Sequence, residues 1–396
     1  MLSNGLFWQA LGFSTVAIGL VVLTAWWLYL SPVKAAAGVV AGPSLNFSLT
    51  IAGLLALSGF QLVAGGFWDA SMHILTGEVP GGADFLWPPH IMIYSSFFVM
   101  LIIAGVATRS IALPARRAGV NDPRQWARRS PYVGAVVIAS LYGLASIPGD
   151  AIWHALFGID LTAWSPPHIM IALASAAPSF AAAGLVHSVR SRLRKPSYAD
   201  LLMALLLAIG VSLIYMVGVI EWELPGNQGP LFAANPLWVY PVVGGGIAFF
   251  GLMVAKRLIP HRWAALGTAL AYFAIRLIIM IGLAATEQVI PYLPLVFIAG
   301  AFLIDWLPWE KVGSTPGREA LLVAAFTLAY VPVAVPVLQA RPDFAEFATS
   351  DIIATLIGVL ILGAILSPLA RLAGEKLAGE STPTPQTAAG KVSRAK

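Results

Sequence analysis

The sequence predicts an all-α fold, a polytopic integral membrane bundle of helices. Apolar residues make up 59% of the 396 residues and charged residues only 10%, whereas an average soluble domain is roughly 25% charged. The mean hydropathy is +0.83, and apolar runs of about 20 residues, the length of a membrane-spanning helix, recur along the chain. A soluble globular domain and a disordered chain are both excluded, because neither combines so little charge with so many apolar residues.

The apolar runs predict about eleven transmembrane helices. They lie near 7–30, 46–68, 90–107, 132–153, 168–187, 201–220, 237–255, 264–284, 288–305, 320–339 and 352–370. The first run is too long for the apolar core of a signal peptide, and no Lys or Arg precedes it, so we expect a retained helix. The eighth and ninth runs are the least clearly divided.

Basic residues gather in alternate connecting segments, which predicts the orientation. Most of the Lys and Arg residues lie in 108–130, 188–200, 256–262, 311–318 and the C-terminal tail. With about eleven crossings these segments share one side, and the positive-inside rule assigns that side to the cytoplasm. We therefore expect a multi-pass cell-membrane protein with its N-terminus outside and its C-terminus inside.

Three regions follow from this pattern. Residues 1–200 carry two related hairpin units, at 68–93 and 149–171, and residues 201–371 form a helical bundle without that motif. Residues 372–396, rich in Ser, Thr and Pro, are predicted to be a disordered cytoplasmic tail. The net charge of +5 is explained by topology and contact with the lipid bilayer, so no nucleic-acid partner is expected.

The repeated unit carries the chemistry. Each copy reads Asp-x-x-x-His-x-Leu-x-Gly, then a short loop, then Pro-Pro-His-Ile-Met-Ile, and the two copies hold four of the six histidines. An Asp and a His four residues apart on a helix share one face. The Pro-Pro pair suits the first turn of the returning helix, so the following His faces back across the hairpin.

Each copy therefore offers one carboxylate and two imidazoles to one point. The predicted metal ligands are Asp69, His73 and His90 in the first copy and Asp150, His154 and His168 in the second. Such a set suits copper, zinc or non-haem iron. Because the chain has no Cys, thiolate ligands are excluded. The second copy has the shorter loop, with Trp153 and Trp164 beside it, so we expect it to bind metal better.

Other interpretations of these residues stay open. A lone intramembrane His more often bonds a neighbouring helix than a metal, but three residues recurring twice favour a site. A haem could use paired histidines, although an Asp one turn away has no role in axial ligation. A transporter or metal-handling protein (copper or zinc) is the main alternative, with Glu287, Arg276 and Asp351 as a candidate polar relay.

Further charged residues have simpler interpretations. Glu221 and Glu223 follow the sixth span and are expected in a hydrated acidic loop on the outer side. Arg276 lies inside an apolar run, so we expect it to pair with a carboxylate across the bundle.

The motif also resembles a known family. The residues Asp150-Ala-Ile-Trp-His154, followed by Pro167-His168, resemble the metal-binding set in a membrane subunit of the copper membrane monooxygenases, the particulate methane and ammonia monooxygenases. The resemblance implies copper at Asp150, His154 and His168, and at the matching set in the first copy. It also implies an oxidoreductase component that works with companion membrane subunits. The sequence identifies no substrate and does not decide between an enzyme and a transporter.

Overall fold

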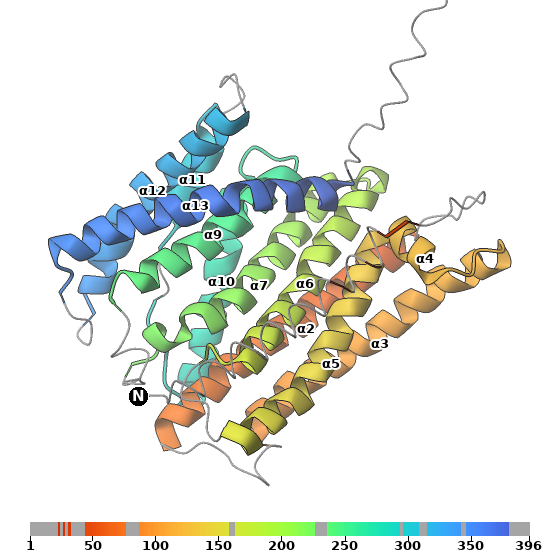
Figure 1. The fold of residues 1–396 in the computed structure, drawn as a ribbon, viewed down its shortest axis with the longest axis horizontal. Helices are drawn as coiled ribbons and strands as arrows, with labels where there is room; N and C mark the ends of the chain where they lie inside the picture. The colour runs from red at the N-terminus through yellow and green to blue at the C-terminus, as the bar shows by residue number, and fades with distance from the viewer. Residues whose placement is uncertain are drawn as a thin grey trace, which may run out of the picture.

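The computed structural model of the chain is all-helical in the residues that it describes (Figure 1). These residues are 23, 27, 31–32, 44–76, 87–157, 163–225, 236–293, 296–308, 315–341 and 346–379. Within them, nine helices are long and apolar enough to cross a membrane by length and composition. This indicates a multi-pass membrane protein whose outer faces contact lipid.

The helices follow one another with short connections. They are α2 (Leu45–Thr76), α3 (Pro88–Arg117), α4 (Pro123–Arg129), α5 (Pro131–Phe157), α6 (Pro166–Val189), the 3-10 turn η3 (Arg190–Arg192), α7 (Pro196–Glu223), α9 (Val239–Leu258), α10 (Ala264–Ala285), α11 (Ile298–Trp306), α12 (Thr315–Gln339) and α13 (Thr349–Ala378). Several begin at a Pro, which lacks an N–H that the first turn would leave unbonded and whose φ already suits a helix.

The central helix of the bundle is α7. It packs against α2, α6, α9 and α10, and it lies between the orange-to-yellow helices of the first half and the green-to-blue helices of the second (Figure 1). Its most apolar window is 83% buried, against 22% for α13. The motif-bearing half and the motif-free half are therefore packed together around α7, and α13 leaves most of its surface to lipid.

Most predicted spans coincide with a long helix, but two stretches of the prediction need comment. The first span, 7–30, lies almost wholly outside the described residues. The ninth, 288–305, is not a continuous helix, because α11 covers only Ile298–Trp306. A helix of that length rises about 14 Å, half the hydrocarbon thickness. Pro291, in the non-helical stretch before it, cannot donate a backbone hydrogen bond, which a hydropathy count does not register.

This interrupted segment still joins the two ends of the bundle. The Val289 N–H donates to Ser71 Oγ over 2.6 Å, near the C-terminus of α2. At the other end, Lys256 Nζ donates to Asp305 Oδ1 over 3.0 Å, where α9 ends. The chain therefore crosses between the two ends as a partly extended and partly helical segment.

The charged contacts divide the bundle into a basic end and a His/Asp end. Three ion pairs lie at the basic end: Arg190–Asp200, Lys256–Asp305 and Arg371–Glu319. The two Asp/His units lie at the opposite end, where α2 meets α3 and α5 meets α6. This grouping is the one that the basic segments predict, and the assignment of the basic end to the cytoplasm stays a prediction.

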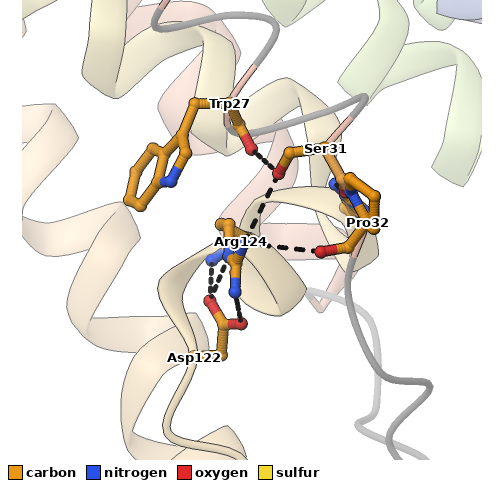
Figure 2. Close-up of polar contacts among 6 residues, drawn as sticks. Trp27, Ser31, Pro32, Asp122 and Arg124 are labelled. Atoms are coloured by element: carbon orange, nitrogen blue, oxygen red, sulfur yellow. Dashed lines mark hydrogen bonds and ion pairs between the residues drawn. The ribbon is translucent and has the colours of Figure 1, made fainter.

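A polar cluster ties the loop before α4 to the N-terminal segment (Figure 2). The Asp122 side chain caps α4 by accepting from the Arg124 N–H over 2.9 Å. The Arg124 guanidinium donates to Asp122 and also reaches Ser31 Oγ and the Pro32 carbonyl, each at 3.5 Å. Arg124 holds the pKa of the Asp122 carboxyl below its usual range through these hydrogen bonds. The stretch after the first predicted span therefore lies at the basic end.

The C-terminal helix is longer than predicted. Helix α13 continues to Ala378 and ends at Gly379, whose φ of 76° is the left-handed conformation that favours Gly at a helix end. Residues 372–378 thus belong to the helix, where Arg371 also pairs with Glu375 one turn on. The rest of the predicted tail, 380–396, lies outside the described residues.

Candidate metal centre

The first copy of the motif brings its three predicted ligands together. Asp69 and His73 lie one turn apart near the end of α2, and His90 lies in the first turn of α3. His73 Nε2 is 3.5 Å from Asp69 Oδ2, and His90 Nε2 is 3.1 Å from Asp69 Oδ1. One potential ligand atom from each side chain lies within 4.8 Å of the other two. A single ion can therefore bind all three with small side-chain adjustments.

Local sequence explains this convergence. The i, i+4 spacing places Asp69 and His73 on one face of α2. Pro88 and Pro89 occupy the first turn of α3, and the preceding Trp87 is extended, with φ −66° and ψ 161°. The chain thus turns sharply into α3 and presents His90 to the end of α2.

The cluster is half-buried. The side chains of Asp69, His73 and His90 are 20%, 29% and 17% exposed. An ion can therefore enter from the end of the bundle, while the surroundings still hold back most water and strengthen electrostatic attraction.

Aromatic rings surround the cluster. The Trp87 ring lies 5.1 Å from the His73 ring and 5.6 Å from the His90 ring, measured between centroids. Trp87 Nε1 donates to Asp69 Oδ1 over 3.1 Å. On the other side, the Tyr94 ring lies 5.6 Å from that of His90. The imidazoles are thus held between two aromatic side chains.

The second copy is described only in part. Asp150 is buried, and its Oδ1 lies 3.8 Å from His168 Nε2. The backbone of His154 belongs to α5, but its side chain lies outside the described residues. The structure therefore brings together two of the three predicted ligands here, and the expected advantage of the second copy stays a prediction.

The matching Trp residues make different contacts in the two copies. In the first copy Trp87 directly precedes the Pro-Pro pair, whereas Ser165 separates Trp164 from that pair in the second. Trp164 Nε1 donates to the Gly218 carbonyl on α7 over 3.1 Å. One inserted residue thus turns the indole toward α7, while Trp87 turns to the carboxylate.

The prediction for Glu223 is wrong. This side chain is fully buried at the end of α7, and Arg276 Nη2 donates to its Oε2 over 2.6 Å, with both side chains 0% exposed. Tyr240 Oη donates to the other carboxylate oxygen over 3.2 Å. The expected pairing of Arg276 with a carboxylate across the bundle is thereby confirmed. Helix α7 continues through Glu223 instead of ending before it, which carries the carboxylate inside. The Glu221 side chain lies outside the described residues.

The proposed relay of Glu287, Arg276 and Asp351 is not assembled. Glu287 is exposed in the turn after α10, at a φ of 58°. Asp351 lies in the first turn of α13, where its carboxylate accepts from the Ala348 N–H over 3.0 Å. Each of the three residues has a different environment, so they do not form one polar path.

Two features of these sites were not predicted from the sequence. The contact of Trp87 with the ligands was overlooked, although a Trp close before Pro-Pro-His in both copies was a usable signal. The burial of Glu223 had no local signal, because its partner lies 53 residues further along the chain.

Comparisons with known proteins add nothing to this geometry. No family model, curated protein or solved structure matches the chain.

Proposed function

We propose that this chain is an integral membrane metalloprotein that binds a transition-metal ion at Asp69, His73 and His90. The observation that carries the proposal is the approach of one carboxylate and two imidazoles to within 4.8 Å of one another at the end of two membrane helices. Ionisable groups at the edge of an apolar bundle are costly to keep unless they serve a site.

The donor set limits the choice of metal. Two imidazoles and one carboxylate suit copper, zinc or non-haem iron and leave a coordination position open for a further ligand. Copper is the first metal to test, because the Asp-x-x-x-His…His motif resembles the metal-binding set of the copper membrane monooxygenases. A redox role in an oxidoreductase with companion membrane subunits is the corresponding activity.

Metal content of the purified protein tests this proposal. The wild-type chain should retain a stoichiometric ion after incubation with copper or zinc and removal of excess metal. An Asp69→Ala/His73→Ala/His90→Ala variant should lose it. His261→Ala is the matched control, because His261 is exposed in the turn between α9 and α10, at the opposite end of the bundle. A wild-type chain without bound metal, or a triple variant with undiminished metal, would overturn the proposal.

A second candidate function is metal-ion transport. The observation that favours it is the interrupted crossing 288–306, which runs beside the buried Arg276–Glu223 pair, since the Tyr292 N–H donates to the Glu223 carbonyl over 2.7 Å. Broken membrane segments beside buried charges are a feature of secondary transporters. Proteoliposomes that enclose a zinc-sensitive dye would show uptake that depends on Asp69. Uptake equal to that of protein-free liposomes would exclude this function.

A further inference from the structure

The two oxygens of Asp69 have different surroundings. Oδ1 accepts from Trp87 Nε1 over 3.1 Å and lies 3.1 Å from His90 Nε2. Oδ2 faces His73 Nε2 at 3.5 Å. The indole therefore occupies one side of the carboxylate and leaves the other side toward the imidazoles.

We propose that Trp87 is a positioning residue for the metal site: its indole N–H holds Oδ1 of Asp69, so that the carboxylate binds the ion through Oδ2 alone. This inference rests on the proposed function. It adds a fourth residue to the site and fixes how the carboxylate is used.

One-oxygen binding matters for the choice of ion. A carboxylate that offers one oxygen beside two imidazoles makes a three-ligand set of the kind that transition metals accept. Calcium and magnesium need six or more oxygens, or several retained waters, and gain little from such a set. Trp87 therefore supports selectivity for zinc or copper over the abundant hard cations.

The Trp87 ring restrains the ligands in a second way. It lies close to the rings of both His73 and His90, which limits the rotation of either imidazole. Hydrogen bonds from outer residues to metal ligands commonly change metal affinity by about 10- to 100-fold when they are removed.

The second copy supplies an internal control. Trp164 is a half-buried indole before the same Pro-Pro-His sequence, but it donates to a backbone carbonyl on α7. Trp87→Phe and Trp164→Phe thus make the same chemical change, while only Trp87→Phe removes a hydrogen bond to a carboxylate ligand.

The experiment is a cobalt titration of the full chain in detergent, with His154→Ala and His168→Ala in the background so that only the first site is observed. Visible absorption reports both affinity and ligand geometry. We expect Trp87→Phe to weaken cobalt binding about 10- to 100-fold and to alter the spectrum of the bound ion. Trp164→Phe should change neither. A Trp87→Gln variant, which restores an N–H donor, should recover part of the affinity and keeps the test valid if Trp87→Phe does not fold.

The outcomes separate this inference from the proposed function. If the background chain binds no cobalt, the proposed function fails. If Asp69→Ala abolishes binding while Trp87→Phe and Trp87→Gln bind like the background, the site stands and the role of Trp87 is wrong. Equal losses in Trp87→Phe and Trp164→Phe would also overturn it, because they would indicate a general packing effect.

Discussion

Asp69 and His90, which lie on different helices, approach to 3.1 Å between Oδ1 and Nε2 at the junction of α2 and α3. His73 joins them from one turn along α2. A carboxylate between two imidazoles is stabilised either by a shared proton or by a cation. The second arrangement is the basis of the proposed metal site, and it places the chemistry of the molecule at the His/Asp end.

The buried Arg276–Glu223 pair should be sensitive to the loss of one partner and tolerant of the loss of both. We expect Arg276→Met to destabilise the chain by about 3–5 kcal/mol, because it leaves the Glu223 carboxylate buried without its partner. The double variant Arg276→Met/Glu223→Leu should recover most of that loss. Thermal unfolding in detergent measures both, and a double variant less stable than either single one would contradict this interpretation.

The second copy should influence the first electrostatically. The Tyr94 phenol interacts with the charges of both Asp69 and Asp150, so both carboxylates lie around one side chain. Asp150→Asn removes a negative charge near the first site and should weaken its metal affinity several-fold. Asp200→Asn, which removes the same charge at the basic end, should have no effect. Isothermal titration with zinc compares the two variants, and equal affinities would show that the copies are independent.

The docking of α4 should weaken in acid. The folded-state pKa of Asp122 is lowered by Arg124, so the stabilisation from this pair is complete above the ordinary Asp pKa. It is lost as the pH falls through the lowered value. Hydrogen exchange of the α4 amides should therefore accelerate below about pH 4.

Asp122→Asn is the matched control for that measurement. Asn caps a helix about as well as Asp but does not titrate, so its α4 amides should exchange faster than wild type at neutral pH and should lose the acid-induced change. An unchanged acid response in Asp122→Asn would show that another group is responsible.

The orientation of the bundle can be tested with single cysteines, because the natural chain has none. Ala118→Cys and Glu287→Cys place exposed thiols at opposite ends of the bundle. In intact cells, a membrane-impermeant maleimide should label Glu287→Cys and should label Ala118→Cys only after the membrane is opened. The reverse pattern would move the metal centre to the cytoplasmic side.

Much of the fold was predictable, because apolar length decides where helices cross. The hairpin at Asp69, His73 and His90 was predictable as well, since helical spacing and the Pro-Pro pair determine it locally. The crossing at 288–305 was only partly predictable, because hydropathy measures transfer from water and does not register the backbone hydrogen bonds that Pro291 interrupts. The direction of the Trp87 indole and the burial of Glu223 depend on contacts between distant segments, which no local pattern contains.

X-ray absorption at the edge of the bound metal tests the central claim most directly. The sample is the full chain with Asp150→Ala, loaded with copper or zinc. The metal-centre account predicts two imidazole nitrogens and a carboxylate oxygen at about 2.0–2.2 Å, and the loss of one imidazole in the His90→Ala variant. A shell without imidazole, or a spectrum unchanged by His90→Ala, would contradict a metal ion held by Asp69, His73 and His90.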